Sequence, residues 1–302
     1  MPQLNAAGLA AVTTGFRKLF TMGANKAKAK YTHLMVQMTS TGSSTKVLVG
    51  GGLPGLRKWV GERHVKSLKL FVTELPNSNY ELTIAVDRDH FEDDEVGMYA
   101  EEVKGLGMQA ELDPDKRTSE LLINGFTAEC FDGETFFSTA HPYRGGTQSN
   151  KGTAALDATA FEAGMAALRS LKNAEGEAVD PFDYGAEAHL IVPPQLEATA
   201  KAIVAVRTLA AGGDNPNYNA AKVVVDGRLS GHPTKWFITL GGENSMLRPF
   251  INVTRKKPQL VALTKVDDTN VFMERMLMWG VDYRGKVGYG AYHAAYGSDG
   301  TT

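Results

Sequence analysis

The chain has 302 residues, a formal net charge of −2, and a composition that is 43% hydrophobic and 22% charged, which is ordinary for a globular protein with a real core. This length predicts one or two domains. Cys130 is the single cysteine, which excludes an intrachain disulfide and a cysteine zinc cluster. No apolar run approaches the roughly 18 residues of a membrane-spanning helix. The N-terminus also lacks the charged segment and long apolar core of a secretory signal.

The charge is unevenly distributed along the chain. Residues 1–61 contain no Asp or Glu, whereas the remainder holds 24 basic and 34 acidic residues. We interpret the leader as an exposed arm in preference to a transit peptide. Such an arm can bind nucleic acid or the acidic surface of a neighbouring copy of the chain. The basic side chains of the leader are Arg17, Lys18, Lys26, Lys28, Lys30, Lys46, Arg57 and Lys58.

Two short elements are predicted within the leader. Leu9, Val12, Phe16 and Phe20 recur at helical spacing, which predicts an amphipathic helix over residues 6–22. The sequence KVLV at 46–49 predicts a strand that leads into a glycine-rich turn.

The run from Gly50 to Gly55 matches the pattern G-x-G-x-x-G, and Glu74 follows where a dinucleotide-binding fold places its ribose-binding acid. A nicotinamide-dependent oxidoreductase is therefore one alternative function. The preceding strand is short, Gly61 interrupts the intervening helix candidate, and Glu74 abuts a predicted turn. These features favour a flexible glycine turn without a cofactor.

Residues 68–88 show a β-hairpin pattern. The segment YELTIAVD at 80–87 alternates apolar and polar residues, LKLFVTE at 68–74 supplies the other arm, and residues 76–79 are turn-forming. Because a two-stranded ribbon is marginally stable alone in water, we expect this hairpin to pack on another surface, including that of a neighbouring subunit.

A long helix is predicted after this hairpin, within the segment 82–125. One face of this helix carries an apolar stripe, which consists of Val96, Tyr99, Val103, Leu106 and Ala110. Pro114 predicts a break or kink, followed by a second segment over 115–123 that packs differently.

The start of this helix is strongly acidic. Asp87, Asp89, Glu92, Asp93, Asp94 and Glu95, together with His90, are candidate ligands for a divalent metal. The central glycine of a calcium loop is absent. Acids at a helix N-terminus also stabilise the helix by about 0.3–1 kcal/mol each, and we prefer this interpretation.

The remaining chain predicts an inserted α/β unit. Residues 131–153 form a loop-rich stretch in which Phe136 and Phe137 are candidate anchors. Ser138 and His141 are three residues apart there, which is not the spacing of a catalytic triad. Residues 150–250 alternate helix and strand patterns, and 271–278 predicts a strand covered on both faces.

Four segments together resemble the major head subunit family of Mu-like phages, the gpT group. They are RKWVGERHV at 57–65, VDRDHFEDDEVGMYAEE at 86–102, FDGETFFSTAHP at 131–142 and WGVDYRGKVGYGAYHAAYGS at 279–298. The resemblance implies an α+β capsid fold of the Hong Kong 97 type and a structural protein without catalytic, cofactor or metal residues. Its implied divisions are an N-terminal arm (1–60), an extended-loop hairpin (61–92), a peripheral domain with a spine helix (93–149), an axial domain (150–255) and a return to the peripheral domain (256–302).

The same resemblance implies that the protein self-assembles into hexamers and pentamers of an icosahedral phage head enclosing double-stranded DNA. It also implies assembly in the host bacterial cytoplasm, with a scaffolding or protease protein and a portal as partners and no membrane. We expect the arm and hairpin of one subunit to lie over the acidic helix start of the next. The expected contact residues are Arg17, Lys18, Lys26, Lys28, Lys30, Glu74, Asn77, Asn79, Asp93, Asp94, Glu95, Glu101 and Glu102. A nucleic-acid-binding module that uses the basic arm is the second alternative.

Overall fold

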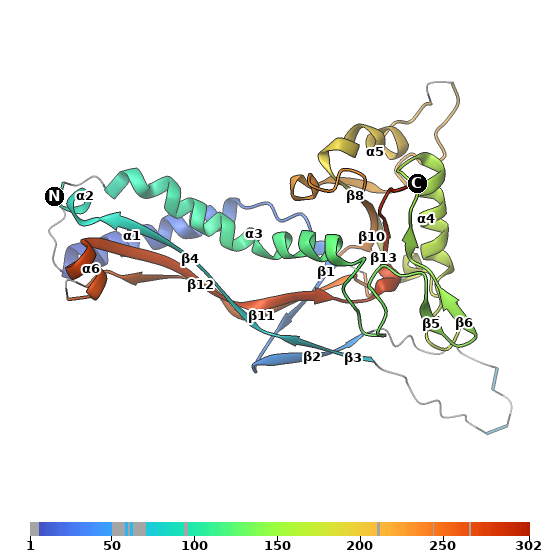
Figure 1. The fold of residues 1–302 in the computed structure, drawn as a ribbon, viewed down its shortest axis with the longest axis horizontal. Coiled ribbons are helices and arrows are strands. Elements are labelled where there is room, and N and C mark those ends of the chain that lie inside the picture. Colours follow the sequence, from blue (N-terminus) through green and yellow to red (C-terminus); the bar gives the residue numbers. More distant parts are fainter. Residues whose placement is uncertain are drawn as a thin grey trace.

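The fold is that of a computed structural model, which describes residues 6–49, 58–59, 61–62, 71–93, 96–209, 212–243, 245–265 and 267–302. It has an elongated part built on long strands and two helices, and a compact part at one end (Figure 1). The described helices include none that is long and apolar enough to cross a bilayer.

The elongated part is a four-stranded sheet with two helices along one face. Its strand order is β1-β11-β12-β4, with β1 parallel to β11 and the other pairs antiparallel. The strands are β1 (Met35–Thr39), β4 (Ser78–Asp87), β11 (Phe250–Leu263) and β12 (Met276–Tyr289). Helices α1 (Ala6–Lys26) and α3 (Ala100–Asn124) run along these strands (Figure 1). Between them lies an apolar core in which the Phe16 ring meets Trp279 edge-on at 4.8 Å.

The compact part is a five-stranded mixed sheet covered by helices. Its order is β7-β13-β10-β8-β9, where β10 is antiparallel to β8 and β13, while the outer pairs β13–β7 and β8–β9 are parallel. The strands are β7 (Lys151–Gly152), β8 (Glu187–Val192), β9 (Lys222–Val225), β10 (Trp236–Gly241) and β13 (Ala295–Ser298). Helices α4 (Ala158–Ser170) and α5 (Glu197–Val204) bury their apolar faces in its core. The Asp157 side chain caps α4 by accepting from the Ala160 N–H at 2.7 Å.

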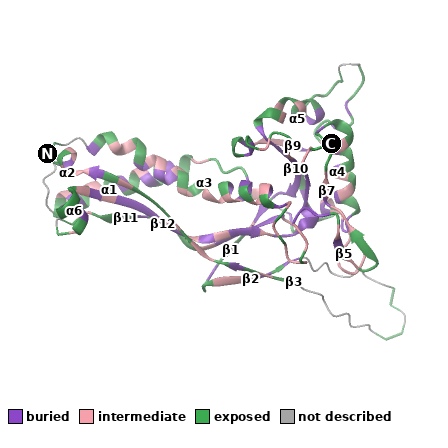
Figure 2. Cartoon of the chain, in the orientation of Figure 1, coloured by how far each residue is buried: buried purple, intermediate pink, exposed green. Residues whose placement is uncertain are grey.

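A third apolar core joins the two parts. It contains Leu122 from α3, Phe237 from β10, Phe250 from β11 and the loop residues Phe136 and Phe137, all fully buried. The predicted role of Phe136 and Phe137 as anchors is confirmed. Burial is accordingly continuous from the long strands into the compact sheet (Figure 2).

Smaller elements complete the described chain. A strand pair, β2 (Ser44–Val49) with β3 (Phe71–Pro76), packs on β11, and β5 (His141–Tyr143) pairs with β6 (Gly146–Gln148). The short helices are α2 (Arg88–Glu92), α6 (Thr269–Glu274) and the 3-10 turns η1 (Thr32–Leu34), η2 (Val96–Tyr99), η3 (Pro181–Tyr184), η4 (Pro194–Leu196), η5 (Gly227–Leu229) and η6 (Tyr292–Ala294).

The hairpin predicted over 68–88 is wrong in its pairing. β3 pairs with β2, and β4 pairs with β12, with Trp279 opposite Ile84. No turn forms at 76–79, because β4 begins at Ser78, directly after Asn77. Alternation identified β4 as a strand, but it carries no information about which strand becomes the partner.

Two further element predictions need correction. Helix α3 is continuous through Pro114, so the predicted break is wrong, although its two halves do contact different cores. The predicted strand over 271–278 is helix α6 followed by the start of β12. Arg275 ends α6 with a left-handed backbone, φ 56°, and this reverses the chain into β12.

Candidate functional site

The basic arm packs on the long helix of its own chain. Helices α1 and α3 cross so closely that a Cβ added to Gly23 would lie 1.9 Å from the Lys104 carbonyl oxygen, and one added to Gly107 would lie 2.0 Å from that of Phe20. Only glycine fits at such backbone contacts. Residues 6–26 of the arm therefore pack on α3 of their own chain, and a contact of the arm with a neighbouring subunit stays a prediction.

The basic side chains of the arm nevertheless remain at the surface. Arg17, Lys18, Lys26 and Lys28 are exposed. Lys30 is also exposed, and its Nζ donates to the Val225 carbonyl at 2.6 Å, so it fastens the arm to the compact part.

The acidic helix start is partly neutralised within the chain. Glu101 accepts a hydrogen bond from Lys104 Nζ at 2.6 Å, and this bond, with the charges of Lys104 and Lys26, lowers the Glu101 pKa. Glu102 and Asp93 are exposed. Asp94 and Glu95 lie outside the described residues. The attraction between arm and helix start is therefore present within one chain.

The three expected contact residues near β3 and β4 differ in their availability. Glu74 on β3 is exposed and accepts from Ser44 Oγ on β2 at 2.5 Å. Asn77 bonds within the chain, donating from Nδ2 to Ser40 Oγ at 2.8 Å and to the Gly42 carbonyl at 2.9 Å. Asn79 is exposed on β4.

The other acids of segment 87–93 serve local structure. Asp87 caps α2 by accepting from the Asp89 N–H at 2.8 Å, Arg88 pairs with Glu92 at 2.8 Å, and Arg275 pairs with Asp89. Within the part of the chain that the structure describes, these acids do not converge into a group of three metal-ligand atoms.

The glycine run Gly50–Gly55 lies outside the described residues. The strands that flank it, β2 and β3, are paired antiparallel, with Lys46 opposite Glu74. A dinucleotide-binding βαβ unit requires parallel strands, so these strands do not supply its scaffold.

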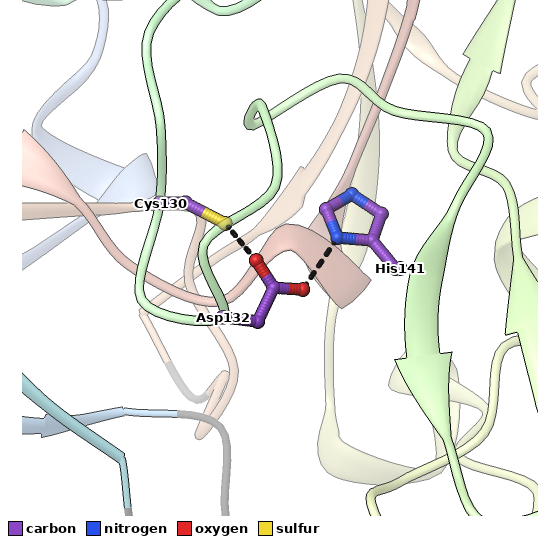
Figure 3. A group of neighbouring side chains, drawn as sticks. All are labelled: Cys130, Asp132 and His141. Atoms are coloured by element: carbon purple, nitrogen blue, oxygen red, sulfur yellow. Dashed lines mark hydrogen bonds and ion pairs between the residues drawn. The ribbon is translucent and has the colours of Figure 1, made fainter.

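A buried polar cluster occupies the loop stretch after α3, and the sequence interpretation missed it. Asp132 lies between Cys130 and His141 (Figure 3). Cys130 Sγ donates to Asp132 Oδ1 at 3.0 Å, and His141 Nδ1 lies 2.7 Å from Asp132 Oδ2. The His141 side chain is fully buried and stacks on the Tyr292 ring at 3.7 Å. Ser138 Oγ donates to Glu134 at 3.1 Å, and no hydrogen bond joins it to His141 within these described residues.

The side chains of the cluster are joined by hydrogen bonds. Its three ligand-type atoms lie within 4.8 Å of one another. Burial and the hydrogen bond to Asp132 raise the pKa of the Cys130 thiol. The thiol therefore keeps its proton and uses it to bond Asp132. The spacing that could have revealed the cluster is Cys130, Asp132 and His141 within one short loop.

A second buried network joins α3, the arm and the compact part. Asp226 accepts from Tyr31 Oη at 2.8 Å and from Ser119 Oγ at 2.5 Å. Asp115 on α3 accepts from the backbone N–H groups of Lys30 and Tyr31 at 2.5 and 3.1 Å. Burial opposes ionisation of Asp226, but these hydrogen bonds outweigh it and lower the Asp226 pKa. This network joins α3 and the arm to the compact part.

A stacked pair of histidines predicts that the stability of the fold falls in acid. The His33 and His189 rings lie 4.0 Å apart, and burial lowers both pKa values, that of His189 to about 4. Above pH ~6.5 the two rings are neutral in the folded chain and in the unfolded chain. Between pH ~6.5 and ~4 the unfolded chain binds protons that the folded chain refuses, so the free energy of unfolding falls as the pH falls.

We expect His189 alone to contribute a loss on the order of 2–3 kcal/mol between pH 7 and pH 4. The measurement is the urea midpoint against pH for the unchanged chain and for His189→Gln, with His232→Gln as the control. The slope should flatten only in His189→Gln. Equal slopes in all three proteins would show that the pair does not govern acid sensitivity.

The solved structures that share this fold are subunits of phage shells and related particles. The chain aligns over 97% of its length with 75% of a chain in the procapsid of bacteriophage JBD30, at TM-score 0.60 and 24% identity. It aligns over 94% of its length with 97% of a chain in the virus-like particle of Pyrococcus furiosus, at TM-score 0.53 and 14% identity. The fold is therefore that of Hong Kong 97-type phage major capsid proteins.

The family follows from sequence comparison. The chain belongs to the family described as Mu-like prophage major head subunit gpT, whose model matches residues 9–155, 149–229 and 227–302. It is 28% identical to the major capsid protein of Escherichia phage Mu over 290 residues, which cover 96% of this chain and 72% of that protein. It is 25% identical to the Mu-like prophage FluMu major head subunit of Haemophilus influenzae over 286 residues, 95% of this chain and 71% of that protein.

The protein is a phage major capsid protein, a structural component of the virion, as the resemblance predicted. It is not an enzyme, and the oxidoreductase alternative is wrong because the family and its relatives are structural. The candidate functional site is consequently the surface with which one subunit contacts others.

Proposed function

We propose that the subunit assembles into hexameric and pentameric capsomers of an icosahedral shell that encloses double-stranded DNA without reading its sequence. The observation that carries this is the exposure of large apolar side chains on an otherwise well-buried fold. Phe272 and Met273 on α6 are 78% and 71% exposed, and Met246 is 80% exposed. Burying such side chains against other subunits removes apolar surface from water, as specific interfaces do at their cores.

Within that assembly we propose the five divisions 1–60, 61–92, 93–149, 150–255 and 256–302 as arm, extended loop, peripheral domain, axial domain and peripheral return. The observed strands support three adjustments to the boundaries of these divisions. The extended loop belongs with β2 and β3, the peripheral return begins with β11 at Phe250, and the C-terminal strand β13 joins the axial sheet. A scaffolding or protease protein and a portal are proposed partners, with assembly in the host bacterial cytoplasm.

The thirteen expected contact residues remain a proposal, and the exposed basic face of α1 is its most accessible part. We expect the double variant Arg17→Glu, Lys18→Glu to fold, because both side chains are exposed. It should reduce shell yield at least about tenfold, because like charges placed at an interface cost several kcal/mol. The matched control is Arg17→Lys, Lys18→Arg, which keeps both charges.

The measurement is sedimentation velocity with circular dichroism on the same samples. Normal secondary structure with lost large species supports the contact. Unchanged assembly in the charge-reversed protein would remove this face of α1 from the contact surface.

A further inference from the structure

The orientation of the Asn150 side-chain amide is fixed by its surroundings. Its Nδ2 faces backbone carbonyls, donating to Phe136 O at 2.8 Å and to Ala295 O at 3.1 Å. Its Oδ1 accepts from the Ser138 N–H at 2.9 Å. A flipped amide would set an oxygen against those carbonyls and an NH₂ against that N–H. Asn150 therefore presents an acceptor to whatever lies on its Oδ1 side.

The group on that side is the imidazole of His141, so both ring nitrogens face acceptors. Nε2 lies 3.1 Å from Asn150 Oδ1, and Nδ1 lies 2.7 Å from Asp132 Oδ2. A neutral imidazole has one N–H and would leave one lone pair facing an oxygen lone pair inside the protein. The arrangement is satisfied when both nitrogens carry protons and Asp132 is a carboxylate. The near-parallel Tyr292 ring, at 3.7 Å and 4°, provides a π face for that cation.

The groups around His141 keep fixed protonation states at mild pH. Burial opposes ionisation of Asp132, but hydrogen bonds from His141 and Cys130 lower its pKa, so it is a carboxylate. Burial raises the pKa of the Cys130 thiol and of the Tyr292 phenol. Burial also lowers the pKa of His293 to about 4, which leaves that ring neutral. Glu134 bonds Ser138 and, through its N–H, Asp132 Oδ1 at 3.1 Å.

The cluster lies where the chain crosses between the two parts of the fold. Asp132, His141 and Asn150 belong to the segment between α3 and β7, whereas Tyr292 lies in η6 and Ala295 begins β13. Asn150 bonds residues of both stretches of the chain, and the His141–Tyr292 stack holds them face to face. Loss of one proton would leave a buried acceptor without a donor at this crossing, which is unfavourable inside the protein.

We propose that His141 is a buried imidazolium that locks the crossing between the elongated and compact parts, and that alkaline removal of its proton loosens this crossing. The crossing is fully hydrogen-bonded when the His141 ring is charged. The stacked pair His33–His189 has the opposite pH dependence, because its rings are neutral in the folded state. The crossing should therefore be tightest at intermediate pH.

The test uses the full-length chain and the isosteric variant Asp132→Asn. In that variant the new side-chain NH₂ can donate to Nδ1 of a neutral His141, while the amide oxygen still accepts from Cys130 and the Glu134 N–H. The network stays satisfied without the charge, so the variant should fold. Because the His141 ring needs no second proton in this variant, alkaline pH should not loosen the crossing. His232→Gln is the control for a histidine away from the cluster.

Two readouts decide the proposal. With ¹⁵N-labelled histidine, NMR at pH 8 should show one ring with both nitrogens protonated in the unchanged chain and none in Asp132→Asn. Hydrogen exchange over 128–150, corrected for intrinsic rates, should lose about tenfold in protection between pH 6.5 and pH 9.5 in the unchanged chain only. A neutral His141 at pH 8, equal pH responses in both proteins, or one zinc ion per chain by mass spectrometry would each overturn the lock.

Discussion

Gly107→Ala is expected to lower the free energy of unfolding by about 1–3 kcal/mol or more, although alanine is the better helix former. The added Cβ would lie 2.0 Å from the Phe20 carbonyl oxygen of α1. That atom belongs to a helix backbone and cannot rotate away as a side chain can. The helices must separate, and separation disrupts the core around Phe16 and Trp279.

The same chain offers matched controls for this contact. Gly105 lies on the same helix and Gly15 on the partner helix, and a Cβ at either position meets nothing within 4 Å. Gly105→Ala and Gly15→Ala should raise the free energy of unfolding by up to about 1 kcal/mol each. Urea midpoints compare the three variants directly. Equal stability of Gly107→Ala and Gly105→Ala would mean that α1 does not rest on α3.

Asp226→Ala is expected to cost about 2–5 kcal/mol. It removes the acceptor of the fully buried Tyr31 hydroxyl. It also removes one of the two acceptors of Ser119 Oγ, which keeps the Asp115 carbonyl at 3.0 Å. The effect should be structural as well as energetic, because this carboxylate joins the arm and α3 to the compact part. Domain orientation would then vary, and we expect irregular particles in place of uniform shells.

A double-mutant cycle isolates this network. Tyr31→Phe alone leaves Asp226 bonded to Ser119 and Arg228, so it should cost about 1 kcal/mol. In the Asp226→Ala background the same change removes an unpaired hydroxyl and should cost nearly nothing. Glu120→Ala, an exposed acid on α3, is the control and should stay within about 0.5 kcal/mol. Additive costs for Asp226 and Tyr31 would show that the two side chains act independently.

The sequence predicted elements better than their partners. Helical spacing located α1 and α3, and Asp157 marked the start of α4 correctly. Alternation found β4, but its partner β12 lies almost 200 residues further along the chain, and local pattern contains no such information. Pro114 predicted a break that packing overrode, since Leu106 before it and Leu122 after it are both buried in cores.

The candidate site shows the same division between local and long-range information. Charge located the basic arm and the acidic helix start, yet attraction between opposite charges does not say whether they belong to one chain or two. The structure places α1 on its own α3 through glycine contacts that no charge pattern indicates. The sequence pattern of Ser138 and His141 does not indicate that His141 bonds Asp132, because that contact depends on how the loop folds back on itself.

The central claim is that this subunit builds a closed shell from rings of identical copies. The most direct measurement is cryo-electron microscopy of the full-length protein expressed alone and with the scaffolding protein of its own phage. We expect closed particles with hexameric and pentameric capsomers, in which α6 and the exposed face of α1 contact other subunits. A protein that stays monomeric under both conditions, or closed particles in which these surfaces face solvent, would contradict it.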